Sequence, residues 1–197
     1  MSKEYREKYL QQCKEMQGKK LLLHACCAPC SSATLEEVLR HFDVAVYFYN
    51  PNIQPKAEYD KRADELIRFV NEFAPGTPVI IEEYDDSEFE RIAKGRENIP
   101  EKGERCYLCY EMRLTAAAKR AKACGFDCFT TTLSISPHKN ADWLNEIGQR
   151  LGTAYGIPFI ASDFKKNDGY KRSIALSAQY GLYRQNYCGC KFSRKDK

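Results

Sequence analysis

The sequence predicts an α/β fold in which helices cover both faces of a mostly parallel sheet. Short runs of apolar, β-branched and aromatic residues alternate with segments whose apolar residues recur every three or four positions. These helical segments are long enough to connect parallel strands. A chain of 197 residues without an internal repeat, linker or low-complexity stretch also favours a single domain over residues 1–197.

The N-terminal segment, residues 1–19, is predicted to form an amphipathic helix because apolar residues recur at helical spacing over 5–16. The apolar run 21–24 predicts the first strand, and the spacing of apolar residues over 35–42 predicts the helix after it. The β-rich run 44–49, closed by an Asn-Pro-Asn turn, predicts the second strand.

The middle of the chain continues the alternation. Apolar residues at a 4-3-4-3 spacing over 59–73 predict a helix, and TPVIIEEY at 77–84 predicts the third strand. A short helix that ends near Gly95 and a polar loop follow. Residues 106–125 predict a longer helix, with Gly125 as its left-handed end.

The last third of the chain supplies two more strands and two more helices. The predicted strands are 129–136 and 157–161, and a helix over 144–155 lies between them. A final helix, 170–180, ends at a glycine. It leads into a basic tail, residues 182–197, that has no clear period.

Ten cysteines are the unusual feature of the composition. Their share is below that of a secreted disulfide scaffold, and the charged start MSKEYREKYLQQ lacks the apolar stretch of a signal peptide. No apolar run is long enough for a transmembrane helix. We therefore expect a cytoplasmic protein without membrane contact, whose thiols serve as metal ligands or redox groups.

Three thiols crowd the loop after the first strand, at Cys26, Cys27 and Cys30. In a parallel sheet this loop lies at the carboxyl ends of the strands, where ligands bind. Adjacent thiols converge only where the backbone turns, and Pro29 favours such a turn. Crowded thiolates need a compensating cation. The loop therefore predicts a metal or cluster site, with three buried apolar thiols as the alternative.

A second thiol pair, Cys106 and Cys109, opens the helix 106–125, where free backbone N–H groups favour thiolates. Together with the first loop it supplies four sulfurs, which suit a four-cysteine zinc site or a 4Fe-4S cluster. Adjacent cysteines are unusual in zinc sites, whose ligands are typically separated by two to four residues, and this favours the cluster.

Cys188 and Cys190 flank Gly189 in the basic tail. Glycine lets the backbone bend enough for the sulfurs to meet, and the small ring of such a disulfide is strained and labile. A reversible redox pair is the favoured interpretation, with free thiols or further metal ligands as alternatives. The remaining cysteines, expected to be buried free thiols, are Cys13, Cys124 and Cys128.

Positive charge gathers toward the C-terminal end. Residues 165–197 carry nine Lys or Arg and two Asp, a net charge of +7, whereas residues 1–164 sum to −3. A basic segment of this kind favours a polyanionic partner such as nucleic acid, with a solvated tail as the alternative.

Five segments, in one order over residues 20–190, resemble the cobalamin-independent epoxyqueuosine reductases, iron–sulfur enzymes of tRNA queuosine biosynthesis. The segments are LLHACCAPCSS, YNPNIQPKAEYDKRADE, RCYLCYEMRL, TTLSISPHKN and QNYCGC. Each piece alone is weak, but CCAP with a later CxxCYxxRL and a terminal CxC is a specific combination.

The resemblance implies the last step of queuosine synthesis, in which epoxyqueuosine at the tRNA wobble position loses its epoxide oxygen and becomes a cyclopentene. It implies a Rossmann-like three-layer fold similar to that of the adenine nucleotide alpha hydrolases. The implied ligands of a 4Fe-4S cluster are Cys26, Cys27, Cys106 and Cys109, and the implied redox-active disulfide joins Cys188 and Cys190. An additional iron associated with the family would take a ligand at Cys30, where other members can carry an acidic residue.

Conversion of an epoxide to an alkene needs two electrons, two protons and loss of water, and no side chain supplies electrons at low potential. We therefore expect a cluster that is supplied by an electron donor still to be identified. A second metal, bound partly by Cys30, is expected to polarise the epoxide oxygen. The Cys188–Cys190 pair is expected to pass electrons or to reset the cluster.

A tRNA substrate also suits the charge distribution. The residues expected to follow phosphates are Lys165, Lys166, Lys171, Arg172 and Arg184. The aromatic residues expected to stack on bases, or simply to pack, are Tyr107, Tyr110, Tyr183 and Tyr187. Further candidates are His138 as a proton donor or substrate contact, and Glu58, Tyr59 and Arg62 as pocket residues, while His24 is expected to be packed.

Two other functions remain open. A PP-loop-like tRNA sulfur-insertion enzyme shares the α/β layout, but its phosphate loop needs glycines that ACCAPCSS lacks. A zinc-stabilised nucleic-acid-binding module uses the same four thiols, but it explains neither Cys30 nor the terminal pair.

Overall fold

The computed structural model describes residues 2–194. Met1, the first residue of the predicted N-terminal helix, lies outside the described residues. So do residues 195–197, the last three of the basic tail. Four strands form one sheet in the order β3-β2-β1-β4, and every pair of neighbours is parallel. The parallel sheet expected from the sequence is therefore confirmed.

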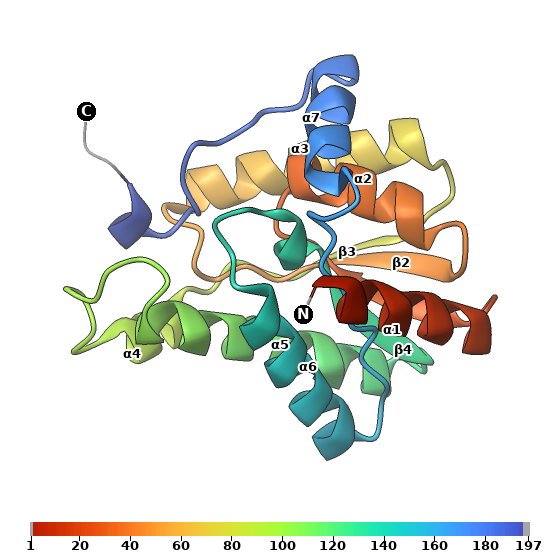
Figure 1. Ribbon diagram of the computed structural model, residues 1–197. Helices are drawn as coiled ribbons and strands as arrows, with labels where there is room; N and C mark the ends of the chain where they lie inside the picture. Colours follow the sequence, from red (N-terminus) through yellow and green to blue (C-terminus); the bar gives the residue numbers. More distant parts are fainter. Residues whose placement is uncertain (1, 195–197) are drawn as a thin grey trace.

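Strands and helices alternate along the chain (Figure 1). The strands are β1 Lys20–His24, β2 Asp43–Phe48, β3 Val79–Ile81 and β4 Cys128–Thr131. The α-helices are α1 Ser2–Glu15, α2 Ala28–Val38, α3 Lys56–Phe73, α4 Ser87–Ala93, α5 Glu104–Ala123, α6 Ala141–Tyr155 and α7 Gly169–Gln179. Two short 3-10 helices are η1 Thr132–Ile135 and η2 Lys191–Ser193. The predicted end of α5 is confirmed, since Gly125 just beyond it has a φ of 71°.

Successive strand residues point to opposite faces of the sheet, and this alternation divides the core into two layers. Leu21 and Leu23 of β1 pack with α1, α2, α3 and α7, whereas Leu22 packs with α5 and α6. Figure 1 shows α2, α3 and α7 on one side of the sheet and α5 and α6 on the other. The molecule therefore has the Rossmann-like three-layer arrangement that was expected.

The predicted fourth strand, 129–136, is wrong in its second half. β4 ends at Thr131, whose hydroxyl accepts a hydrogen bond from the backbone N–H of Leu133 at 3.1 Å, and the chain turns into η1. Hydroxyl side chains offer the backbone a local partner in place of a neighbouring strand. The run of threonines, although β-rich in composition, thus shortens the strand.

The predicted fifth strand, 157–161, is reduced to a single bridge between Phe129 and Phe159. On its other side the backbone pairs with a side chain instead of a strand. The amide of Gln12 on α1 donates to the Phe159 carbonyl and accepts from the Ala161 N–H, both at 2.9 Å. The sheet therefore ends here. The predicted third strand, 77–84, is likewise shortened to Val79–Ile81 at the opposite edge.

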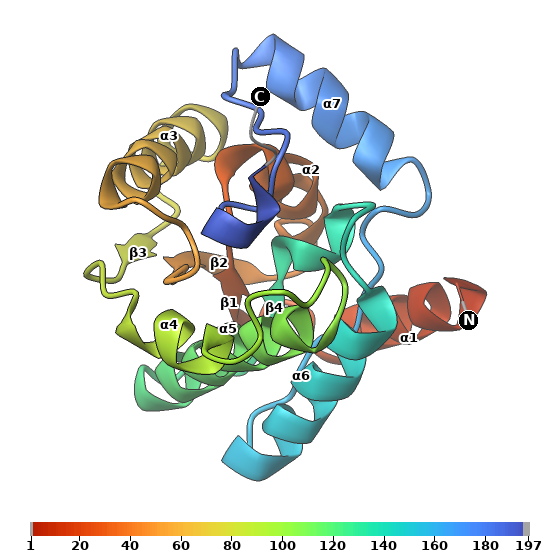
Figure 2. The ribbon, with the colours of Figure 1, turned by 90° about the vertical axis from the view of Figure 1, so that its left-hand side faces the viewer.

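The C-terminal segment returns across the carboxyl ends of the strands, as Figure 2 shows. There the carbonyl of Gly189 accepts a hydrogen bond from the backbone N–H of Gln54 at 3.0 Å. None of the helices in residues 2–194 is both long and apolar enough to cross a membrane. The loops after β1 and β4 and the returning tail thus share one edge of the sheet.

Candidate metal and redox site

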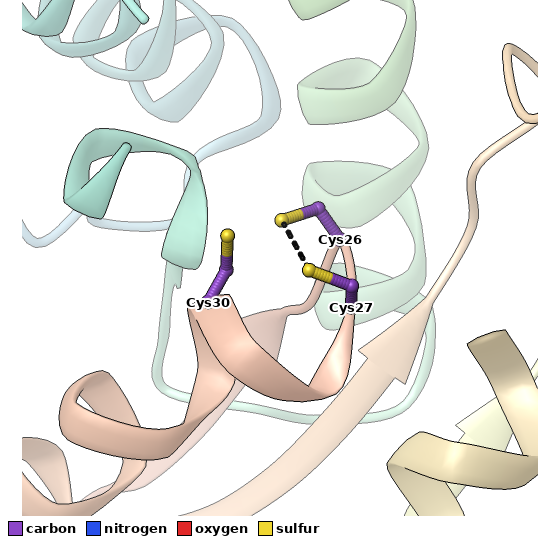
Figure 3. A group of neighbouring side chains, drawn as sticks. All are labelled: Cys26, Cys27 and Cys30. Atoms are coloured by element: carbon purple, nitrogen blue, oxygen red, sulfur yellow. Dashed lines mark hydrogen bonds between the residues drawn. The ribbon is translucent and has the colours of Figure 1, made fainter. Parts of the chain in front are cut away.

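The three cysteines predicted in the first loop converge at the carboxyl end of β1 (Figure 3). Cys26 and Cys27 lie in that loop, whereas Cys30 lies in the first turn of α2, because the helix begins earlier than predicted. Their sulfurs lie within 4.8 Å of one another, and those of Cys26 and Cys27 are 3.8 Å apart. Cys27 is the N-cap of α2, with extended backbone angles, and Pro29 stands in the first turn. The turn expected at Pro29 is therefore present, and it brings the three thiols together.

The three thiols differ in their acidity. Hydrogen bonds from Cys27 and Cys30, with further help from Arg113, hold the pKa of Cys26 well below its ordinary value. The same contact raises the pKa of Cys27 to about 12, and the pKa of Cys30 is also raised. The Thr132 hydroxyl lies 3.5 Å from the Cys26 sulfur as a donor. The surroundings therefore favour the thiolate of Cys26 over those of Cys27 and Cys30, and a thiolate is a soft anionic ligand for a metal.

The second thiol pair lies in the first part of α5. Cys109 is 7% exposed, and its burial raises its pKa to about 12. The sulfur of Cys106 accepts a hydrogen bond from the backbone N–H of Lys102 at 3.4 Å. Within residues 2–194, the group of three or more possible metal ligands whose ligand atoms all lie within 4.8 Å of one another is Cys26, Cys27 and Cys30, and it includes neither Cys106 nor Cys109. The shared four-cysteine site thus stays a prediction.

Arg113 connects the two sets of cysteines. It lies one helical turn beyond Cys109 and donates a hydrogen bond to the side-chain oxygen of Asn50. The amide nitrogen of Asn50 in turn donates to the carbonyl of Ala25 at 2.9 Å, next to Cys26. Arg113 was not among the residues predicted for the site. The sequence offers one indication of it, because an arginine four residues after Cys109 lies on the same face of the helix.

The returning tail brings its two cysteines to the same region. Both Cys188 and Cys190 are free thiols, and Gly189 between them has a φ of 114°, which favours glycine. Cys190 is buried and packs in one small cluster with Cys109. The expected bend is therefore present, and it places the terminal pair beside a predicted cluster ligand. The redox role of the pair stays a prediction.

Lys139 contacts this pair directly. Its ammonium nitrogen donates to the Cys188 sulfur at 2.7 Å. Burial raises the pKa of the Cys188 thiol, but Lys139 and Arg113 outweigh that effect and hold its pKa below the ordinary value. The candidate in this loop was His138, which is exposed. The contact with the cysteine pair belongs to the next residue, a distinction that loop sequence alone does not make.

The three candidates that follow β2 divide into an ion pair beside the tail cysteines, formed by Arg62 and Glu58, and one core residue, Tyr59. Arg62 is 3% exposed, pairs with Glu58 at 2.7 Å and donates to the Cys188 carbonyl at 3.3 Å. Tyr59 instead packs in the core, and its hydroxyl donates to the Glu82 carbonyl at 2.6 Å. Tyr59 is therefore not a pocket residue.

The remaining predictions for thiols and histidines are mostly confirmed. His24 is packed, as expected. Its ring nitrogens lie 2.9 Å from the Thr131 hydroxyl and 3.1 Å from the Tyr49 carbonyl. Burial lowers its pKa to about 3, so the ring is neutral. Cys13 and Cys128 are buried, but Cys124 is exposed at the end of α5, and the prediction of a buried thiol there is wrong.

Two of the residues expected to follow phosphates are paired with carboxylates. Lys165 pairs with Asp163 at 2.8 Å, and Arg172 pairs with Glu36 at 2.6 Å. Arg172 and Lys166 line a cavity of about 400 Å³ whose walls include none of the ten cysteines. The exposed residues of the expected set are Lys166, Lys171, Arg172 and Arg184.

The four tyrosines that were expected either to stack on bases or to pack differ in their burial and contacts. Tyr110 is 2% exposed in the core, so of its two expected roles it has that of ordinary packing. Tyr107 packs edge-on against Trp143. Tyr183 and Tyr187 are half-buried beneath cations, with the Lys61 ammonium 3.6 Å from the Tyr183 ring centre.

These features define a class: a three-layer α/β protein with a thiol-rich site at the carboxyl edge of its sheet. The chain belongs to the family of the epoxyqueuosine reductase QueH, whose family model matches residues 21–196. A QueH from Staphylococcus epidermidis is 46% identical over 180 residues, which cover 88% of this chain and 76% of that protein. A QueH from Thermotoga maritima is 37% identical over 176 residues, which cover 88% of this chain and 89% of that protein.

The fold is also similar to a solved structure, the U34-tRNA thiolase NcsA from Methanococcus maripaludis with its [4Fe-4S] cluster. The TM-score is 0.59, with 11% sequence identity, over 97% of this chain and 69% of that chain. At this identity the likeness concerns the fold, and it confirms the predicted fold class.

Proposed function

We propose that this protein reduces epoxyqueuosine to queuosine at the wobble position of tRNA, the last step of queuosine biosynthesis. The observation that carries the proposal is the family match over residues 21–196. The convergence of three thiols at the end of β1 supports it, because the reaction needs a source of low-potential electrons. Neither the zinc module nor the sulfur-insertion enzyme has comparable support.

The donor set fits an iron–sulfur cofactor. Thiolates are the usual ligands of such clusters, and buried cations beside them offset their charge. Cys26, Cys27, Cys106 and Cys109 would hold a 4Fe-4S cluster, which when bound supplies electrons one at a time. Cys30, whose sulfur lies with those of Cys26 and Cys27, would contribute a ligand to an additional adjacent iron.

We propose that Cys188 and Cys190 are the redox-active pair. Oxidation of two thiols to a disulfide releases two electrons and two protons, which are the quantities that removal of the epoxide oxygen as water consumes. Lys139 supports this role because its ammonium donates to the Cys188 sulfur and lowers the pKa of that thiol, which favours the thiolate, the reactive form. An external electron donor would return the pair to its thiol form after each turnover.

The remaining parts of the proposal concern the partner and the setting. The tRNA would approach the carboxyl edge of the sheet, where Tyr187 lies beside Arg62. We also propose that the site belongs to one α/β domain, and that the protein works in the cytoplasm, where thiols stay reduced.

The test is turnover of epoxyqueuosine-containing tRNA by anaerobically reconstituted protein, followed by mass analysis of the nucleosides. We expect a brown protein that contains iron and sulfide and forms queuosine. The Cys109→Ala variant should lose iron and activity, whereas Cys124→Ala, an exposed cysteine outside the site, should keep both. A colourless protein that holds zinc and forms no queuosine would contradict the proposal.

A further inference from the structure

Arg113 is a buried charge to which the proposed reaction assigns no task. Its side chain is 1% exposed, and it lies on α5 one turn beyond Cys109. The guanidinium stays protonated at any pH at which the protein is folded. Burying such a charge is strongly unfavourable unless an anion accompanies it. An anion is therefore expected to balance the charge of Arg113.

Carboxylates do not supply that anion. Among residues 2–194, no Asp or Glu forms an ion pair with Arg113. Its guanidinium donates a hydrogen bond to the neutral amide of Asn50, and its Nε atom has no partner within the described chain. Arg62, which is nearly as buried, differs in this respect because it pairs with Glu58 at 2.7 Å.

Cysteines lie on both sides of Arg113. Cys109 is one helical turn before it on α5, and the pKa of the guanidinium is raised despite its burial because Cys109, Cys26 and Cys188 are close to it. Thiols that bind a metal lose their protons, so these cysteines become anionic when they act as ligands. The contact through Asn50 to the Ala25 carbonyl fixes the guanidinium at the base of the first loop. Arg113 is therefore held between the two cysteine sets that would share a cluster.

We infer that Arg113 is the counter-charge of the bound cluster, a positioning residue that stabilises its more reduced form. This inference rests on the proposed function, in which Cys26 and Cys109 are cluster ligands. Each electron that a cluster accepts adds negative charge, and the net charge around a cluster is one determinant of its potential. A fixed cation nearby favours the reduced form more than the oxidised one.

The test compares two neutral variants, Arg113→Gln and Arg113→Met, with the charge-conserving Arg113→Lys. Each protein is reconstituted anaerobically, and the midpoint potential of its cluster is measured by spectroscopic redox titration. We expect more negative potentials for the neutral variants and a smaller shift for Arg113→Lys. The control is Arg120→Met on the same helix, because Arg120 pairs with the carboxylate of Glu82 and should leave the potential unchanged.

A second measurement is the rise in thermal midpoint when the apoprotein takes up its cluster. It should be smaller in the neutral variants, which lack the cation that makes loading favourable. Gln keeps a donor for Asn50, so Arg113→Gln tests the charge with the least change in packing. If one of the two neutral variants fails to fold, the potential and the thermal gain measured on the other decide whether Arg113 acts through its charge.

The outcomes separate the two proposals. A wild-type protein that binds neither iron nor sulfide overturns the proposed function and this inference with it. A wild-type protein that loads its cluster, with neutral variants of unchanged potential and unchanged thermal gain, overturns the role of Arg113 alone.

Discussion

At the residue scale, the contact between Lys139 and Cys188 sets the reactivity of the terminal pair. The ammonium donates to the sulfur at 2.7 Å and, with Arg113, holds the thiol pKa below its ordinary value despite burial. The thiolate is therefore present at a lower pH than in the unfolded chain. It is lost only as the pH falls through the folded pKa.

We expect Lys139→Met to slow alkylation of Cys188 in the reduced apoprotein at pH 7 by about tenfold, since one pKa unit changes the thiolate fraction about tenfold. The pH at which alkylation is half-maximal should rise. Peptide mass spectrometry after timed alkylation measures both effects. Lys165→Met is the matched control, because that lysine pairs with Asp163. Equal rates in wild type and Lys139→Met would contradict the assignment.

The thiols after the first strand could be predicted at this scale, because few residue types other than cysteine bind metals through sulfur and because Pro29 marks the turn. The roles of Lys139 and Arg113 could not be predicted. Lysine and arginine are ordinary surface residues, and only long-range packing buries them beside sulfur. Lys139 contacts a residue 49 positions away, a separation that no local pattern encodes.

At the scale of elements, the bend of the returning tail depends on one glycine. A Cβ atom on Gly189 would lie 3.0 Å from Cγ1 of Ile53 and 3.1 Å from Nη1 of Arg62, and the φ of 114° disfavours other residues. Gly181 also has a positive φ, but a Cβ there would meet nothing within 4 Å.

We therefore expect Gly189→Ala to displace the two tail cysteines and to lower queuosine formation by about tenfold or more. Gly181→Ala should reduce stability by about 1 kcal/mol, the usual cost of a left-handed conformation, and keep its activity. Turnover and urea unfolding measured on both variants make the comparison. Similar activity in the two proteins would show that the Gly189 bend is not required.

Helix α6 owes its close approach to the sheet to a small residue. A Cβ atom on Gly148 would come within 2.5 Å of the Phe159 ring. Gly148→Ala should therefore destabilise the protein by about 1–3 kcal/mol through overpacking, although alanine is the better helix former. Thr153→Ala on the exposed side of α6 should change stability by less than about 0.5 kcal/mol. Urea unfolding tests both, and a stabilised Gly148→Ala would contradict the packing argument.

The elements also show where local sequence patterns stop being sufficient. Most helices and the central strands β1 and β2 were predictable, because their periodicity and burial agree, but α2 spans Ala28–Val38 where the apolar spacing predicted 35–42. The run 157–161 has the composition of a strand, but its outer edge pairs with Gln12, which is 147 positions from Phe159. Whether a β-rich run becomes a strand is decided by what lies next to it in space.

At the scale of the whole molecule, the charge asymmetry predicts salt-sensitive binding of tRNA. If about five phosphates are contacted, affinity should fall with salt with a log–log slope of roughly −4. Lys171→Glu in the basic segment should weaken binding and flatten that slope, whereas Lys119→Glu on α5 should have little effect. Both lysines are exposed, and both changes alter the net charge equally. Fluorescence titrations over a salt series measure this, and identical behaviour of the two variants would argue against a tRNA surface in the basic segment.

The site as a whole could be predicted as a set of residue types but not as an arrangement. The motifs identified the thiols, and the parallel sheet predicted that the first loop lies at its carboxyl edge. The sequence could not show that the tail packs Cys190 into one cluster with Cys109, because that cluster also needs Phe89 of α4 and Met112 of α5.

The wide separation of the thiol segments along the chain has a consequence for folding. Cys26, Cys109 and Cys190 come to the same edge of the sheet only after two long loops have closed, and each closure lowers chain entropy. The contacts within β1, α2 and β2 involve far shorter separations. During unfolding, the thiol site therefore cannot outlast the sheet that gathers its parts. The colour of a bound iron–sulfur cluster would then report a completely folded chain, not a partly formed one.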